Sequence, residues 1–207
     1  MTAMRQSGQL RQSGALGSGT GKIATLVGIV ALVLPLIHAV LLARMGFGFV
    51  LDDWYTLRNA HFDGAFAAAG ADQLVARPGA WFVYGVVFGL MGDTPFLILL
   101  GLAAIRAATT YALWGFMRTF VPDVIAAAIA IVWVLLPITS SLEFWASGAN
   151  ISLALLLAVC GCVALDRARW AGRGAPLLGS LLLALAALSY EAVVPAAAVA
   201  VVAVVWR

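Results

Sequence analysis

The stretch GAWFVYGVVFGLM, residues 79–91, decides the fold predicted for this chain, because it is apolar throughout yet only 13 residues long. A helix needs about 20 apolar residues to cross the roughly 30 Å of hydrocarbon in a bilayer. A segment of this length therefore fits an interfacial or re-entrant helix better than a membrane span. Trp81, Phe82 and Tyr84 favour the same position, because such rings prefer the headgroup boundary.

The rest of the chain is also strongly apolar. Of its 207 residues, 64% are hydrophobic and 10% are charged, and the mean hydropathy is +1.05, whereas a soluble domain carries about 25% charged residues. This composition predicts an all-α integral membrane protein with membrane lipid as its main partner. The formal net charge of +3 is too small, and the charges too scattered, to indicate a nucleic acid as a partner.

Five long apolar runs lie outside residues 79–91, and the last of them has room for two short crossings. We divide this run at Tyr190-Glu191, because a carboxylate and the nearby Pro195 both disfavour the interior of a membrane helix. The six predicted spans are residues 23–43, 95–117, 122–140, 149–165, 176–190 and 192–206. Residues 1–22 are rich in Gly, Ser and Gln and contain no acidic residue, which predicts a disordered cytoplasmic tail.

The distribution of basic residues predicts which side of the membrane each loop occupies. If residues 79–91 do not cross and the N-terminus is cytoplasmic, eight basic residues lie inside and three lie outside. The eight are Arg5, Arg11, Lys22, Arg118, Arg167, Arg169, Arg173 and Arg207, and the three are Arg44, Arg58 and Arg77. This agrees with the positive-inside rule, whereas a crossing at 79–91 would move the basic cluster at 167–173 outside. Residues 44–94 are therefore predicted to form a large outer loop with a juxtamembrane helix.

Two adjacent carboxylates, Asp52 and Asp53, stand near the start of this outer loop, close to the bilayer surface. Neighbouring carboxylates repel each other, which raises one pKa or recruits a cation. Either result suits a general base or a metal ligand, so the cofactor that the pair suggests is a divalent cation. The alternative interpretation is a solvated acidic turn beside an interfacial helix. Trp54 and Leu57 recur at helical spacing in the same segment, which predicts an amphipathic helix on the membrane surface.

Arg106 lies eleven residues into the second predicted span, about 16 Å deep at 1.5 Å per residue. An Arg at this depth costs about 2.5–3.5 kcal/mol even on the most lenient insertion scale, so it is expected to face a cavity, an acid or a lipid phosphate. The simplest alternative is a structural ion pair with Glu143 or Glu191. These two acids occupy the second and third outer apices, which can converge with Asp52 and Asp53 on one pocket.

Taken in chain order, these features resemble the C-type superfamily of membrane glycosyltransferases, which take sugars from polyprenyl-phosphate donors. The resemblance covers residues 23–206, and the order of the motifs carries it more than any single motif. The motifs are Asp52-Asp53-Trp54, Arg77-Pro78, the turn from Gly92 to Pro95, Pro137, Glu143-x-Trp145-x-Ser147-Gly148, and Ser189-Tyr190-Glu191 with Pro195.

The resemblance implies roles for individual residues. Asp53, or else Asp52, would be the catalytic base or a metal ligand, and Arg77 or Arg106 would meet the charge on the lipid phosphate. Glu143 and Glu191 would complete the binding site for the polyprenyl-phosphate sugar.

Members of this superfamily generally continue into more helices, so the resemblance also implies a truncated chain or a second chain that supplies a C-terminal half. The rival hypothesis is a non-catalytic polytopic membrane subunit, a scaffold or a transporter component, in which the acids only solvate the outer loops.

Overall fold

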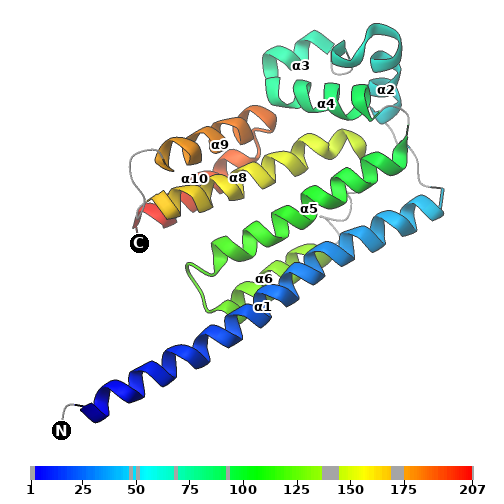
Figure 1. The fold of residues 1–207 in the computed structure, drawn as a ribbon. Helices are drawn as coiled ribbons and strands as arrows, with labels where there is room; N and C mark the ends of the chain where they lie inside the picture. Colours follow the sequence, from blue (N-terminus) through cyan, green and yellow to red (C-terminus); the bar gives the residue numbers. More distant parts are fainter. Residues whose placement is uncertain are drawn as a thin grey trace.

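The computed structural model describes residues 3–46, 49, 52–67, 70–91, 94–136, 145–168 and 175–206. Every regular element within these ranges is a helix, and Figure 1 shows how the helices lie against one another. The predicted all-α fold is therefore confirmed for the described residues.

In the described part of the chain, three helices are long and apolar enough to cross a membrane, by length and composition. They are the Gly21–Arg44 part of α1 (Ala3–Arg44), α5 (Pro95–Met117) and α8 (Ala149–Ala168). Three shorter apolar helices lie with them, α6 (Asp123–Leu135), α9 (Ala175–Ser189) and α10 (Val193–Trp206). Each of the six predicted spans thus contains a helix. At 1.5 Å per residue, however, the shorter three are only about 20–22 Å long, so three of the six have the length of a crossing.

The predicted division of the last apolar run at Tyr190-Glu191 is confirmed. Helix α9 ends at Ser189, a turn follows, and α10 begins at Val193. The turn keeps its backbone groups paired, because the N–H of Val193 donates to the Tyr190 carbonyl (3.3 Å) and the N–H of Val194 donates to the Glu191 carbonyl (3.0 Å). The chain can therefore reverse here while the Glu191 side chain points out of the helices.

Helix α1 begins earlier than the sequence predicts. Residues 3–22 are helical and continuous with the apolar part, which differs from the disordered tail that their Gly and Ser content predicts. The physical reason is that extending an existing helix adds one hydrogen bond per residue and avoids the cost of nucleation. Figure 1 shows this N-terminal part projecting beyond the other helices.

The predicted outer loop contains four short elements: α2 (Asp52–Asp63), the 3₁₀ turn η1 (Ala65–Ala67), α3 (Gly70–Ala76) and α4 (Pro78–Leu90). The 13-residue helix expected at 79–91 is confirmed as α4, and Pro78 suits its first position because that residue has no intrahelical N–H partner to lose. Gly64 (φ 103°) and Gly70 (φ 72°) supply the left-handed turns on either side of η1.

Helix α4 lies across the ends of three bundle helices. Its first turn meets the end of α9, since a Cβ placed on Gly79 would come within 2.8 Å of the Ser189 backbone. Further along, Val87 and Phe88 pack in one apolar cluster with Ile98 of α5 and Ala149 of α8. We call this part of the molecule, where α2, α3 and α4 cover the bundle, the α2–α4 end.

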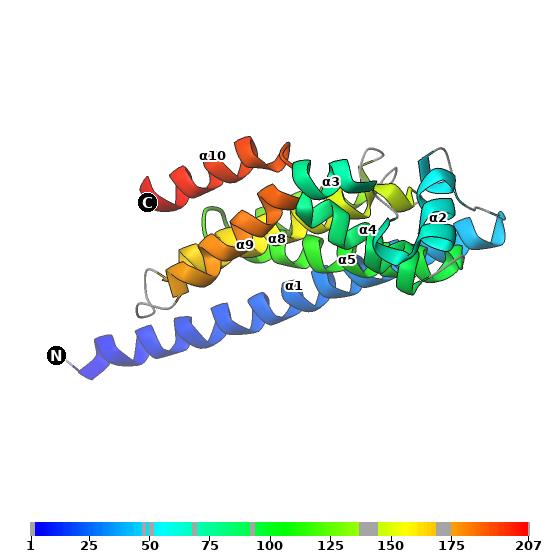
Figure 2. The same ribbon diagram turned by 90° about the horizontal axis from the view of Figure 1, so that it is seen from above.

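The bundle itself packs through small residues. The backbones of α8 and α9 approach so closely that a Cβ on Gly161 would lie 3.1 Å from the Gly179 carbonyl oxygen. Helices α1, α5 and α6 share a core of Val27, Trp114 and three alanines of α6. Figure 1 shows α8 and α9 on one side of α5, with α1 running along the other, and Figure 2 shows α10 and α1 on opposite sides of α8 and α9. Membrane helices associate by this kind of close packing, because lipid is as apolar as their side chains.

Candidate functional site

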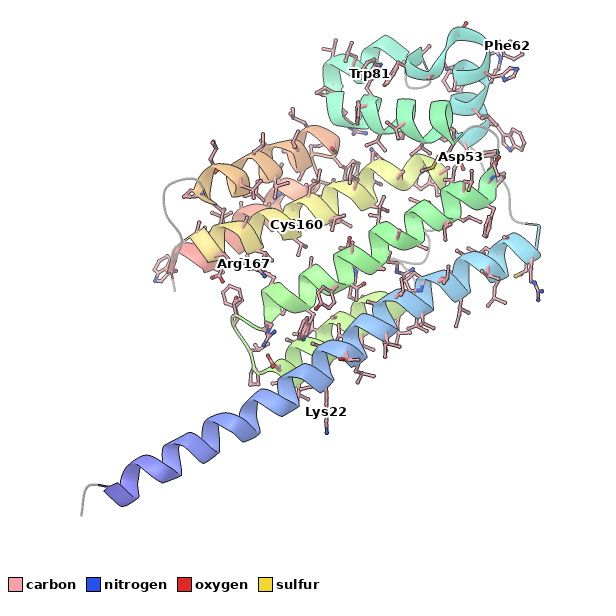
Figure 3. The ribbon with its side chains drawn as sticks, in the orientation of Figure 1. Lys22, Asp53, Phe62, Trp81, Cys160 and Arg167 are labelled. Carbon is pink, nitrogen blue, oxygen red and sulfur yellow. The ribbon has the colours of Figure 1, made fainter. Side chains whose placement is uncertain are left out.

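Asp53 is the buried carboxylate of the α2–α4 end. It is the second residue of α2, and its relative exposure is 0%. The backbone N–H of Ala146, in the segment before α8, donates to its Oδ2 atom (3.3 Å). Figure 3 places Asp53 where α2 meets the start of α5. The first and second predicted outer loops therefore meet at this carboxylate.

The space beside Asp53 is small. A cavity of about 10 Å³ adjoins it, between Phe49, Pro95 and Ala146, which is room for about one water molecule. A general base must come within about 2.6–3.2 Å of the oxygen whose proton it accepts, and a cavity of this size does not admit a sugar ring. In this conformation Asp53 joins two loops and is closed to a glycosyl acceptor.

The other predicted carboxylates near this point are outside the described residues. Asp52 begins α2, but its side chain is not among those described, and Glu143 lies in the 137–144 gap. Within the described part of the chain, no three His, Cys, Asp or Glu side chains lie together in a way that suits a metal ion. The Ala146 N–H also donates a hydrogen bond to one carboxylate oxygen of Asp53, with which a cation would have to compete. Among the described side chains, therefore, Asp53 is the one member of the predicted acid pair whose contacts are known, and it belongs to no cluster of three carboxylate, His or Cys ligands that would complete a cation site.

Arg77 and Glu191 bind each other. The Arg77 guanidinium forms an ion pair with the Glu191 carboxylate and lies over the Tyr190 ring, 5.3 Å from its centroid. Hydrogen bonds from its own backbone N–H and from Arg77 lower the pKa of Glu191, and the same pair raises the pKa of Arg77. Both side chains keep contact with solvent, at 36% and 61% exposure. This contact joins the segment before α4 to the turn between α9 and α10.

Arg106 has a backbone partner. It is 8% exposed, halfway along α5, and its guanidinium donates to the carbonyl of Val134 near the end of α6. The last carbonyls of a helix have no intrahelical donor, and a cation there also meets the negative end of the helix dipole. The ion pair with Glu191 that the sequence allows is not formed, because Glu191 binds Arg77.

A cavity of about 260 Å³ opens beside Arg106, between α1, α5 and α6. Pro35 and His38 of α1 line it, together with Val134 and Leu135. A cavity is one of the three surroundings predicted for Arg106, and this one is lined by described residues of α1, α5 and α6.

The predicted site residues that are described lie in three places. Asp53 is near the C-terminal half of α4, where Trp54 and Leu57 of α2 share a cavity with Phe88 and Gly89. Arg77 and Glu191 are at the N-terminal end of α4, about 20 Å away along a 13-residue helix. Arg106 lies about halfway along α5, away from both of these places. Of the acids predicted to converge, the two whose side chains are described, Asp53 and Glu191, do not line a common pocket.

Sequence reasoning missed a hollow at the α2–α4 end. It has a volume of about 820 Å³ and lies between α2, η1 and α4. Trp54, Leu57, Arg58 and His61 line it from one face of α2, with the i, i+3, i+4, i+7 spacing of a helix face. The same spacing can be read in the sequence. Arg58 and His61 lie on the same face of the predicted amphipathic helix as Trp54 and Leu57, and this combination would have indicated the site.

Comparison of the chain with protein-family models, with curated proteins and with solved structures gives no match. Its function therefore has to be argued from the residues and contacts described above.

Proposed function

We propose that this chain is a membrane glycosyltransferase, or part of one, which transfers a sugar from a polyprenyl-phosphate donor to an outer-face acceptor. The observation that supports it best is the meeting of two loops at Asp53, through the Ala146 N–H. In the C-type superfamily that the sequence resembles, an acid of the first outer loop is catalytic. Here that acid contacts the loop carrying the Trp145-x-Ser147-Gly148 motif.

The proposal includes six crossings with a cytoplasmic N-terminus. The position of α4 across the ends of α5, α8 and α9 supports it, because a helix lying over helix ends does not need to cross beside them. The short helices α6, α9 and α10 would cross by local thinning of the bilayer or with the help of flanking residues. The excess of basic residues on the predicted inner face supports the orientation.

The proposed chemistry is base-assisted attack of an acceptor hydroxyl on the anomeric carbon. The hydroxyl loses its proton to a carboxylate, and the bond from the anomeric carbon to the lipid phosphate breaks. Asp53 would serve once the Ala146 contact opens, and Asp52 beside it is the second candidate. Arg77 would meet the charge of the leaving phosphate after releasing Glu191.

A second candidate function is a non-catalytic membrane subunit, a scaffold or a transporter component. The complete burial of Asp53 favours it, since a buried carboxylate that accepts a backbone N–H serves as a structural link. The ion pair of Arg77 with Glu191 favours it in the same way, because it satisfies both charges without any substrate.

Glycan transfer by matched carboxylate variants separates the two candidates. The protein, in native membranes with its partners, is supplied with a radiolabelled polyprenyl-phosphate sugar, and incorporation into the acceptor is measured. Asp53→Asn keeps an oxygen for the Ala146 N–H but removes the base, so transfer should fall about 100-fold or more. Asp52→Asn tests the second candidate base. The control is Asp63→Asn, at the exposed end of the same helix, which should keep full transfer. If neither Asp52→Asn nor Asp53→Asn lowers transfer, the chain is a non-catalytic subunit.

A further inference from the structure

The hollow between α2, η1 and α4 has the size of a ligand site. Its volume of about 820 Å³ lies within the range of about 300–1,000 Å³ that small-molecule sites usually have. The Phe49 ring lies 5.5 Å from the Trp54 ring and 6.2 Å from the Phe88 ring, centroid to centroid. These three rings form an apolar side of the hollow. Gly89 of α4 and Ala65 of η1 also line the hollow, and they pack so closely that a Cβ on Gly89 would lie 2.2 Å from the Ala65 Cβ.

The polar side chains that line the hollow include two basic residues, Arg58 and His61. Arg58 is the charged residue among those that line the hollow, and His61 lies one turn further along the same face of α2. In the described part of the structure no ion pair joins Arg58 to a carboxylate. An apolar hollow with an available guanidinium at its edge is complementary to an anion that carries a hydrocarbon part, because Arg binds phosphate through paired N–H donors.

The surroundings of the hollow indicate where that anion comes from. Trp54 and Phe62, which line it, are 60% and 75% exposed, and Tyr55 beside them is 65% exposed. Aromatic rings exposed in this way prefer the headgroup layer of a bilayer. Pro95, the first residue of the span-length helix α5, also lines the hollow. The hollow therefore lies at one end of a helix long enough to cross the membrane, at the level of lipid phosphates.

We propose that this hollow binds an anionic phospholipid of the bilayer, with the lipid phosphate on Arg58 and the upper part of an acyl chain against Phe49, Trp54 and Phe88. The bound lipid holds the α2–α4 end on the membrane surface. Asp53 is fully buried and does not line the hollow, although the small cavity beside it shares Phe49 and Pro95 with the hollow. The proposal requires the α2–α4 end to lie at a bilayer surface, but it does not require glycosyl transfer.

Native mass spectrometry of the full chain tests the proposal. The protein is purified in a non-ionic detergent and titrated with phosphatidylglycerol or, separately, with phosphatidylcholine. Wild-type protein should bind one phosphatidylglycerol much more tightly than any phosphatidylcholine. Arg58→Gln should weaken that binding about tenfold, by removing a charged hydrogen bond, and Arg58→Lys should recover most of it. The matched control is Arg167→Gln, an exposed Arg at the far end of α8, which should bind phosphatidylglycerol like the wild type.

Four results would overturn the proposal. The first is equal binding of phosphatidylglycerol by wild type and Arg58→Gln, and the second is an equal loss in Arg167→Gln, which would show a non-specific charge effect. The third is complete competition by inorganic phosphate, which would indicate a site for free anions rather than for a lipid. If a polyprenyl phosphate displaces phosphatidylglycerol at equimolar concentration, the hollow is a donor site and not a resident-lipid site.

The outcome is independent of the proposed enzymatic activity. Asp53→Asn should bind phosphatidylglycerol like the wild type whether or not it transfers sugar. Loss of transfer with lipid binding retained supports the enzyme, and loss of lipid binding in Arg58→Gln with no effect of Asp53→Asn on transfer supports the lipid site alone.

Discussion

The helix bundle and the α2–α4 end are held together by different forces. In the bundle, α8 and α9 pack backbone against backbone at Gly161 and Gly179, with no room for a side chain between them. The α2–α4 end instead packs aromatic rings on the bundle and is joined to it by two polar contacts, Asp53 with Ala146 and Arg77 with Glu191. The stability of the bundle therefore depends on close packing of complementary helix surfaces. Attachment of the α2–α4 end depends on a few polar contacts, which ligands or protons can disrupt.

The largest expected effect comes from filling the α8–α9 contact. In Gly161→Leu, even the Cβ atom would lie 2.9 Å from Leu183 Cγ and 3.1 Å from the Gly179 carbonyl. Overpacking of this kind should lower the free energy of unfolding by about 2–3 kcal/mol. Unfolding in a detergent and denaturant mixture measures it. The matched control is Gly115→Leu in α5, where nothing lies within 4 Å of an added Cβ. If both variants lose the same stability, the close contact is not what holds the bundle.

A smaller and more local effect is expected at the α2–α4 end. In Gly89→Leu the new Cβ would lie 2.2 Å from the Cβ of Ala65, so η1 must move away from α4. The bundle helices do not share this contact, and their unfolding should change by less than in Gly161→Leu. Limited proteolysis should show faster cleavage near residues 64–67. Global unfolding as severe as that of Gly161→Leu would mean that the two regions are not separable.

The smallest effect is expected from the ion pair between Arg77 and Glu191, because both side chains are partly exposed and solvent screens the pair. The folded-state pKa of Glu191 is lowered, so the pair stabilises the fold above the ordinary carboxyl pKa and is lost as the pH falls through the lowered value. Melting curves of wild type and Glu191→Gln from pH 7 to about pH 3 should therefore differ at neutral pH and converge in acid. A constant difference across this range would contradict the pairing.

The sequence predicted the helices better than their contacts. The helices in the five long apolar runs, the 13-residue helix over 79–91 and the turn at Tyr190-Glu191 all follow from length, apolar content and helix-breaking residues, which are local properties. The helical start of α1 was not predicted, because Gly and Ser have a low helix propensity. In the structure these residues extend the long helix that follows them, which avoids the cost of nucleation.

The candidate site was harder to predict, because its contacts join distant segments. Asp53 and Ala146 are 93 positions apart, and Arg77 and Glu191 are 114 apart. The partner of Arg106 is a backbone carbonyl at a helix end, which no residue type in the sequence marks. A single sequence can place charged residues on one side of a membrane, but it does not show which of them neutralise each other.

The most direct test of this account is the side of the membrane on which the α2–α4 end lies, since both the proposed enzyme and the proposed lipid site require the outer side. Cys160 and Cys162 are first replaced by Ser, and single cysteines are then introduced as Gly92→Cys and Arg167→Cys. A membrane-impermeant maleimide added to intact cells should label the cysteine at 92, and should label the one at 167 only after the membrane is permeabilised. Labelling of the cysteine at 92 only after permeabilisation would contradict the account.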